Sequence, residues 1–322
     1  MSLDSRRALR TRGCLVALLT GLVAVALARA DDHRVRLAPR FTPGHTFCYR
    51  IESSSVTAGE TTTPIVNPEG GTHSSQSIHL VICLDALDAP PAPGSAPGAI
   101  RLRATCQKSS AESESDAFDP SGTSLSDQYA RLEGQSLEFT MNPGGRLADI
   151  QGSEGAFADR AAAEPVVAWL EGLLTSAAFP RDGISVGQKW TSERPLIGAP
   201  LSGLVWRTDS TYLRNEACNS SAGAPECAVV LTQFKILRRG SSRPDATPED
   251  YRRNGLRTSG SWTGSGESLD SISLATGLLV NSTQTSTQDV DYKITSSSTG
   301  STIHRKGRTE SHSEITLLPD QK

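Results

Sequence analysis

Serine, glycine and acidic residues crowd together in the stretch GSWTGSGESLDSISLATGLL, which runs from Gly260 to Leu279. The nucleophile turn of α/β-hydrolases needs the order glycine, any residue, serine, any residue, glycine, whereas Ser265 has a glycine directly on each side. The sequence also lacks the phosphate-binding P-loop and the zinc motif HExxH. Ser265 therefore has no predicted catalytic role. Trp262 is expected to anchor a strand in the core, while the flanking glycines let that strand bend or admit a close neighbour.

Paired carboxylates are the catalytic arrangement that stays open, because glycosidase acids can come from separate strands. The candidate pairs are Glu267 with Asp270, and Glu52 with Glu193. Carbohydrate sites usually need aromatic ring faces, however, and aromatic residues form only 5% of the chain. Charged residues in strands generally mark a solvated face. The sequence therefore predicts a non-enzymatic protein without a cofactor, with a paired-carboxylate hydrolase as one alternative.

The N-terminus has the features of a cleaved signal peptide. Four arginines form a basic leader, an apolar run follows from Cys14 to Leu27, and Ala28-Arg29-Ala30 supplies the small-x-small cleavage pattern. Removal of residues 1–30 and a periplasmic or extracellular location are predicted. The apolar run is shorter than the roughly 20 residues of a membrane span, so no span is predicted in the mature chain. The general secretory and twin-arginine routes both stay open.

The predicted mature chain is acidic. The leader contains five of the Lys and Arg residues and one Asp, so 27 basic and 34 acidic residues remain, with a net charge of −7. Nucleic-acid affinity comes largely from Lys and Arg that neutralise phosphates, so nucleic acid is not an expected partner. Electrostatic docking on anionic lipid is disfavoured for the same reason.

Cysteines in an exported chain are read first as disulfides. Cys218 and Cys227 flank the turn-rich loop NSSAGAPE and are expected to bond across a hairpin. Cys83 and Cys106 lie symmetrically about Gly94-Ser95, so a second cross-strand disulfide is predicted between them.

Cys48 is then left over and is expected to be a buried thiol. A metal site is not predicted, because the sequence has no CxxC motif and its six histidines are scattered without ligand spacing.

Most of the mature sequence alternates at period two, which is typical of β-strands. The alternating segments are 47–52, 78–84, 100–105, 137–141, 230–236, 290–294 and 315–317. The stretch from Leu278 to Thr295 has no proline or internal glycine. A straight strand of that length would approach about 60 Å, so it must curl, bulge or break. A strongly bent sheet or partial barrel is therefore expected.

One segment, from Asp159 to Ala178, has helical periodicity instead. Its apolar positions recur at spacings of three and four and are Val166, Trp169, Leu170, Leu173 and Leu174. Their stripe needs a surface to cover, and the concave face of a curved sheet would serve. Trp169, Leu173 and Leu174 are the candidate ligand-binding residues if this helix roofs a pocket. The alternative is a helix that plugs the sheet as permanent core.

The chain also repeats itself around this helix. PGHTFCYR at 43–50 is similar to VGQKWTSE at 186–193, and LEFTMNPGGRLADI at 137–150 is similar to SISLATGLLVNS at 271–282. Two similar β units are therefore predicted at 31–152 and 183–319, joined by a linking helix at 153–182. A single continuous domain over 30–319 stays open, as does chance similarity between glycine hairpins.

These openings, Gly44-His45-Thr46-Phe47 and Gly187-Gln188-Lys189-Trp190, resemble those of a class of exported bacterial proteins of unknown function. The hairpins at Gly145 and Gly277 share that resemblance. The architecture it implies is similar to that of the periplasmic lipoprotein-carrier superfamily. The expected fold is mainly β: a large curved antiparallel sheet or half-barrel from two similar β units, with one helix across the concave face.

The function that this resemblance implies is that of a non-enzymatic envelope protein. Such a protein would bind or carry a lipid or another hydrophobic ligand, for example a lipoprotein acyl chain. The alternative is a structural or protein-interaction module of the cell envelope, whose partner would be another envelope protein.

Overall fold

The computed structural model divides into two units, Met1–Val35 and Arg36–Lys322. It describes residues 34–62, 71–89, 95–116, 124–143, 145–152, 167, 170–174, 179–180, 182–196, 198–219, 221, 223–240 and 246–319. The predicted signal peptide lies outside the described residues, as does most of the predicted linking helix. All elements below belong to the second unit.

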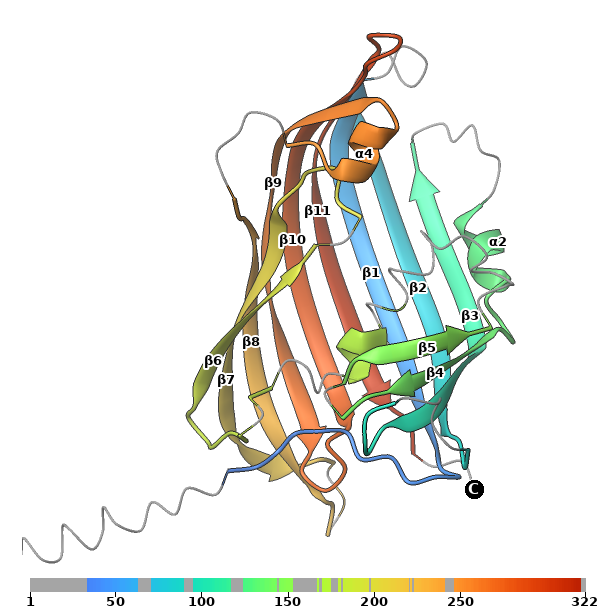
Figure 1. The fold of residues 1–322 in the computed structure, drawn as a ribbon, viewed down its shortest axis with the longest axis vertical. Helices are drawn as coiled ribbons and strands as arrows, with labels where there is room; N and C mark the ends of the chain where they lie inside the picture. The colour runs from blue at the N-terminus through green and yellow to red at the C-terminus, as the bar shows by residue number, and fades with distance from the viewer. Residues whose placement is uncertain are drawn as a thin grey trace, which may run out of the picture. The chain divides into compact units, whose positions relative to one another are not determined.

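Eleven strands form one antiparallel sheet that is not closed into a barrel (Figure 1). The strands are β1 (Thr46–Thr62), β2 (Gly71–Ala86), β3 (Ile100–Ser115), β4 (Ser136–Met141), β5 (Leu147–Gln151), β6 (Lys189–Pro195), β7 (Leu204–Ala217), β8 (Glu226–Arg238), β9 (Leu256–Ser273), β10 (Leu279–Ser296) and β11 (Thr302–Leu317). Two short helices, α2 (Leu125–Ala130) and α4 (Glu249–Arg253), lie between strands, and residues 170–174 are also helical. The predicted mainly β, antiparallel fold is confirmed.

The spatial order of the strands is β5-β4-β3-β2-β1-β11-β10-β9-β8-β7-β6. The chain thus builds two meanders, β1–β5 and β6–β11, in which each strand lies beside the one before it. The first and last strands then pair with each other from Tyr49↔Leu317 to Thr62↔His304. This β1–β11 seam turns the two meanders into one continuous hydrogen-bonded sheet.

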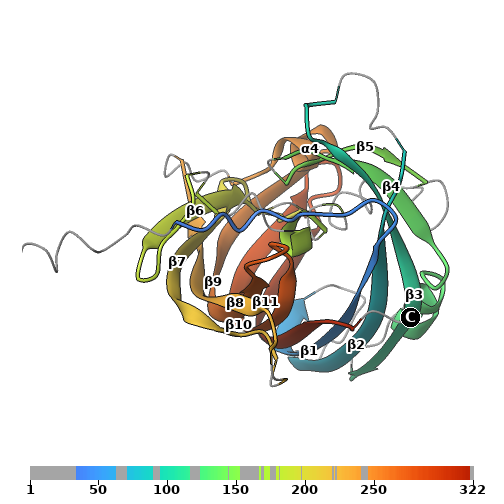
Figure 2. The same cartoon turned by 90° about the horizontal axis from the view of Figure 1, so that it is seen from below.

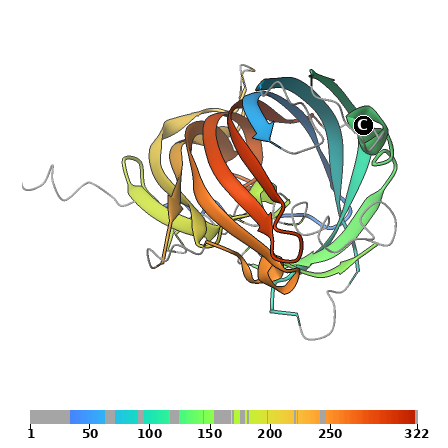
Figure 3. The ribbon, with the colours of Figure 1, turned by 90° about the horizontal axis from the view of Figure 1, so that it is seen from above.

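The sheet curls strongly, as Figures 2 and 3 show from its two ends. β9 and β10 contain 18 residues each, and β10 coincides with the long strand expected from the sequence. The helical turn at 170–174 lies inside the curve (Figures 1 and 2). Long right-twisted strands cannot stay flat, so the curl is the expected consequence of their length.

Successive side chains of each strand point alternately to an inner face and an outer face of the sheet. The inner face carries the buried side chains of Tyr49, Leu84, Leu102 and Phe139. The outer face of the long central strands is exposed at nearly every second residue. The outer face therefore meets water, and the core lies on the inner face.

A second apolar cluster lies on the inner face of β7–β10. Its buried members are Ala199, Leu201, Leu204, Ile236 and Ala246, and Leu196, Trp206, Trp262 and Tyr292 pack against them. Trp262 is only partly buried, and its indole N–H donates to Gln288 Oε1 at 3.1 Å. Gly266 admits a close neighbour, because an added Cβ there would collide with the Phe234 ring and the Thr285 carbonyl oxygen.

Candidate functional site

The predicted ligand-binding residues of the helix are packed into the core where the structure describes them. Leu173 is 4% exposed and Leu174 is 1% exposed, alongside Leu170 at 2%. Trp169 lies outside the described residues. This burial is the packing of core side chains, and contact of these leucines with a ligand stays a prediction.

The disulfides differ from the prediction in one pair. Cys218 bonds to Cys227 across the β7–β8 hairpin, as expected, with 5.0 Å between their Cα atoms. Cys83, however, bonds to Cys48 and not to Cys106, with a Cα–Cα distance of 4.0 Å. The predicted Cys83–Cys106 disulfide is therefore wrong, and so is the leftover thiol at Cys48. Among the described residues, the cysteine with a free thiol is Cys106.

A single β-bulge explains this error. Cys48 and Cys83 are direct partners in the β1–β2 ladder. Between β2 and β3 the register shifts at Val81/Ile82, which places Cys106 opposite Ile82 and leaves Cys83 opposite Thr105. Neighbouring residues of a strand point to opposite faces, so Cys83 and Cys106 face away from each other. Burial raises the pKa of the Cys106 thiol.

The candidate carboxylate pairs do not converge. Glu267 and Asp270 are three residues apart on β9, so their side chains lie on opposite faces of the sheet. Glu52 is on β1 and Glu193 is on β6, with five strands between them, which is about 29 Å measured along the sheet at 4.8 Å per strand. Glu193 forms an ion pair with Arg239 instead. Neither pair can flank one glycosidic bond.

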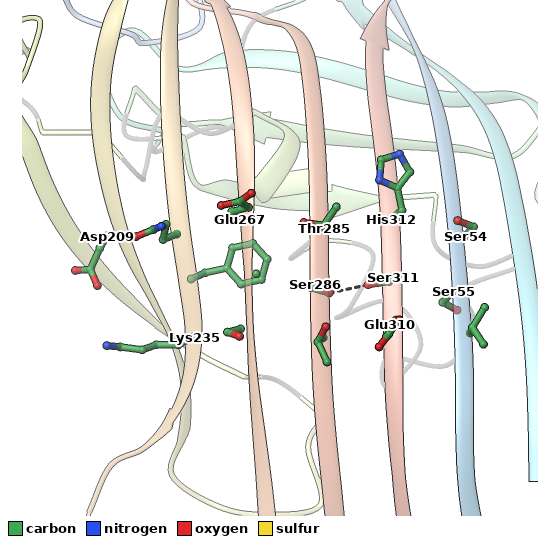
Figure 4. Close-up of a pocket in the computed structure, with 16 residues that line it drawn as sticks. Ser54, Ser55, Asp209, Lys235, Glu267, Thr285, Ser286, Glu310, Ser311 and His312 are labelled. Carbon is green, nitrogen blue, oxygen red and sulfur yellow. Dashed lines mark hydrogen bonds between the residues drawn. The ribbon is translucent and has the colours of Figure 1, made fainter.

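A groove of about 760 Å³ crosses the outer face of β7–β11 and β1 (Figure 4). One wall is the ladder row Asp209, Gln233, Glu267, Thr285, His312 and Ser54. The other wall is the row Lys235, Ser265, Thr287, Glu310 and Val56. We call it the outer groove.

The floor of the outer groove is main chain. It is formed by the intervening row Phe234, Gly266, Ser286, Ser311 and Ser55. The side chains of this row point to the inner face, where the Ser286 and Ser311 hydroxyls lie 2.6 Å apart (Figure 4). The two walls are two residues apart along each strand, which is about 7 Å, so the groove is narrow and runs across the strands.

Negative charge dominates the outer groove. Its carboxylates are Asp209, Glu267 and Glu310, and its lysine is Lys235. The Thr191 hydroxyl donates to Asp209 at 2.7 Å. This bond, followed by hydrogen bonding from Arg207, lowers the pKa of the Asp209 carboxyl. Asp209 therefore keeps its charge to lower pH than an ordinary aspartate.

A smaller groove of about 360 Å³ lies farther along β9, β10, β11 and β1 on the same face. It adds three carboxylates, Glu60, Asp289 and Asp291, and two cations, Lys306 and Arg308. His304 Nε2 lies 2.7 Å from Asp291 Oδ1, and this contact is the main cause that lowers the pKa of the Asp291 carboxyl. The two grooves together hold six carboxylates against three Lys or Arg side chains.

The inner face opposite the grooves is rich in hydroxyls that bond to one another. Cross-strand hydroxyl pairs form at Thr57–Thr309 (2.9 Å), Ser210–Thr232 (2.9 Å) and Ser192–Thr208 (2.7 Å). These contacts satisfy the polar groups locally.

Asp270 is a carboxyl on the inner face, and its pKa is shifted from the ordinary value. Burial raises this pKa, although Ser282 and Ser268 donate hydroxyl hydrogen bonds to the carboxylate at 2.6 and 3.1 Å. Desolvation therefore outweighs the two hydrogen bonds.

Two further observations limit the chemistry of the described part of the chain. Within it, no group of three or more His, Cys, Asp or Glu side chains is placed to hold a metal ion. Among the same residues, no helix is both long enough and apolar enough to span a membrane.

Glu267 and Ser265 stood out in the sequence, but the other groove residues did not. The sequence pattern that contains the other groove residues is the alternation of polar residues along the long strands. This pattern indicates a solvated face, but it does not show which strands are neighbours. No protein-family model matches the sequence, and no curated protein matches it either. The resemblance to the lipoprotein-carrier superfamily therefore rests on the residues quoted above.

Proposed function

We propose that the protein is an exported, non-enzymatic binding protein whose partner docks in the outer groove. The observation that carries this proposal is the acidic, solvent-facing groove that crosses six adjacent strands. Two disulfides fit an oxidising compartment outside the cytoplasm. This proposal selects the interaction-module hypothesis, with the groove as its binding surface.

The dimensions of the groove favour an extended segment of polypeptide. Six strands at a spacing of about 4.8 Å give a length of about 24 Å, which equals about seven residues of extended chain. The wall residues Gln233, Thr285 and Thr287 offer hydrogen-bonding groups along that length. A narrow surface groove accommodates an extended segment better than it encloses a small molecule, which pockets normally surround.

The charge of the groove favours a basic segment. Glu267 and Glu310 lie on opposite walls of the groove. Glu267 is on β9 and Glu310 is on β11, the two strands that flank β10. Lysine side chains are long and flexible, so lysines of an extended partner could reach the carboxylates on both walls. Such contacts are exposed, so they would add specificity and association rate, and salt would weaken them.

A labelled eight-residue peptide of alternating Lys and Ser tests this proposal by fluorescence anisotropy. We expect saturable binding at low salt, weaker binding at 0.5 M NaCl, and no binding of the matching Glu–Ser peptide. The double substitution Glu267→Lys and Glu310→Lys should weaken binding by about tenfold or more, which corresponds to loss of about 1.4 kcal/mol.

The matched control is Glu112→Lys with Glu114→Lys. These glutamates lie exposed on β3, outside the groove, and the control changes the net charge by the same amount. Equal weakening by both double variants would mean that the peptide senses net charge only, which would contradict a role of the groove.

Hydrophobic-ligand binding is a second candidate because aromatic rings gather on the inner face of β7–β10. Trp206 and Phe234 meet edge to face at 5.3 Å between ring centroids, and Trp262 stacks on Tyr292 at 6.2 Å. All four rings are partly exposed. A lipid or lipoprotein acyl chain could lie against such a surface.

Native mass spectrometry with lipid extraction tests the second candidate. Carriage of a lipid predicts a co-purified species that Trp262→Ala depletes, whereas Ser265→Ala on the outer face leaves it unchanged. Recovery of no lipid from the wild-type protein would rule out stable carriage and leave the groove proposal intact.

A further inference from the structure

Three cysteines lie on three adjacent strands, in a pattern that the binding function does not use. Cys48 is on β1, Cys83 is on β2 and Cys106 is on β3, and the disulfide joins the first two. Cys106 keeps a free thiol that is half-buried, and its sulfur donates to the Lys108 carbonyl oxygen at 3.4 Å.

The bulge between β2 and β3 is what separates Cys106 from Cys83. From Ser74↔Ser115 to Val81↔Lys108 the two strands keep one register, and continuation of that register would place Cys83 directly opposite Cys106. Instead Gln107 is the extra residue, and the pairing resumes one step later at Ile82↔Cys106. Both Gln107 and Lys108 are exposed. In a bulge of this kind, two residues of one strand lie opposite one residue of its neighbour.

We propose that Cys83 is a shared disulfide partner, and that migration of this bulge past Cys106 exchanges the Cys48–Cys83 disulfide for a Cys83–Cys106 disulfide. Bulge migration turns Cys106 to the outer face and places it beside Cys83, which is already bonded there. The register that Cys106 would adopt is the one that β2 and β3 already use from Ser74↔Ser115 to Val81↔Lys108.

The chemical step is internal thiol–disulfide exchange. The Cys106 thiol loses its proton to water, and the thiolate attacks the Cys83 sulfur. The Cys83–Cys106 bond forms as the Cys83–Cys48 bond breaks, and Cys48 leaves as a thiolate that takes up a proton. One disulfide and one thiol are present before and after, so no external oxidant or reductant is consumed.

Main-chain hydrogen bonds explain why Cys48–Cys83 is the form in the structure. The Cys106 N–H donates to the Gln135 carbonyl at 3.0 Å, and the Gly134 N–H donates to the Cys106 carbonyl at 2.8 Å. Cys106 must release these two bonds when it turns. The exchanged form therefore carries a local cost and is the minor state.

The exchange would move a covalent link relative to the β1–β11 seam. In the structure the disulfide ties β1, a seam strand, to β2. In the exchanged form it ties β2 to β3, and β1 is held at this end by hydrogen bonds alone. The exchange would therefore change how firmly the seam strand β1 is anchored to its neighbour β2.

Disulfide mapping by mass spectrometry tests the proposal on the folded full-length mature protein. With Cys48→Ser, we expect mild oxidation in native buffer to join Cys83 and Cys106 while the far-ultraviolet circular dichroism stays unchanged. Cys218–Cys227 provides an internal standard in the same digest. With Cys83→Ser, both Cys48 and Cys106 should stay reactive to alkylating agents, because β2 separates their strands.

Deletion of Gln107 in the Cys48→Ser background is the matched control. It removes the extra residue, fuses the two registers into one and holds Cys106 opposite Ile82, so no Cys83–Cys106 disulfide should form. A Cys48→Ser protein that keeps both thiols free would overturn the proposal, and so would equal disulfide formation with and without Gln107.

Wild-type protein decides the question even if these variants fail to fold. After incubation at pH 8.5, acid quenching and alkylation, we expect a fraction of molecules labelled on Cys48 in place of Cys106. If only Cys106 is ever labelled, the exchange does not occur.

Discussion

The two faces of the central strands use polar side chains in opposite ways. On the inner face of β1 and β11, hydroxyls pair with each other, as Thr57 does with Thr309. On the outer face of the same strands, Glu310 and its neighbours project charge into water beside a main-chain floor. Polar groups that satisfy one another leave little for a partner, whereas solvated charges along a groove can still form new contacts. The outer face is therefore where binding is expected.

Truncation of a core residue on the inner face should have the largest effect. Leu84 is fully buried on β2, so Leu84→Ala should lower the free energy of unfolding by about 2–5 kcal/mol. Val56 on the outer face is 45% exposed, and Val56→Ala should change the free energy of unfolding by less than about 0.5 kcal/mol. Urea unfolding monitored by circular dichroism gives both values. Similar losses at the two positions would contradict the assignment of faces.

Addition of a methyl group at Gly266 should lower the free energy of unfolding by an intermediate amount. Gly266→Ala places its Cβ against the Phe234 ring and the Thr285 carbonyl oxygen, and overpacking of this kind costs about 1–3 kcal/mol. In a double-mutant cycle with Phe234→Leu, part of this cost should disappear because the smaller side chain makes room. Strict additivity of the two changes would show that the ring does not occupy the space above Gly266.

Asp270, the buried acid on β9, should have a smaller effect on stability, and that effect should depend on pH. Burial raises the pKa of Asp270 in the folded protein, so the folded state holds this proton more tightly than the unfolded state does. Stability should therefore fall as the pH rises above the unfolded pKa of about 3.9.

Asp270→Asn should remove that loss, because the amide does not ionise. Calorimetric melting temperatures of both proteins between pH 4 and pH 7 provide the measurement. Parallel curves for the two proteins would mean that Asp270 is not desolvated.

Local pattern predicted much of the fold. Period-two alternation gave the strands, and the unbroken stretch that became β10 predicted the curl of the sheet. The predicted Cys83–Cys106 disulfide was wrong because Gln107 is an extra residue that forms a bulge and changes which residue lies opposite Cys83. No local pattern in the sequence indicates such a bulge. The exchange proposed for Cys106 depends on the same residue.

The candidate site could not be predicted in the same way. Glu310 and Val56 lie side by side across the seam although 254 residues separate them in the chain. Their contact depends on the register between the first and last strands, which no periodicity within either strand contains. Leu173 and Leu174 did show a helical pattern, but that pattern is the same for a core plug and for a lid.

The central claim is that a basic extended segment binds to the outer face across the seam. A Lys–Ser peptide with one photoreactive residue, irradiated in complex with the protein and mapped by mass spectrometry, tests it most directly. We predict cross-links to residues 283–289 of β10 and 308–314 of β11, which are lost with Glu267→Lys and Glu310→Lys. Cross-links to the aromatic residues of the inner face, or cross-links that survive both substitutions, would contradict it.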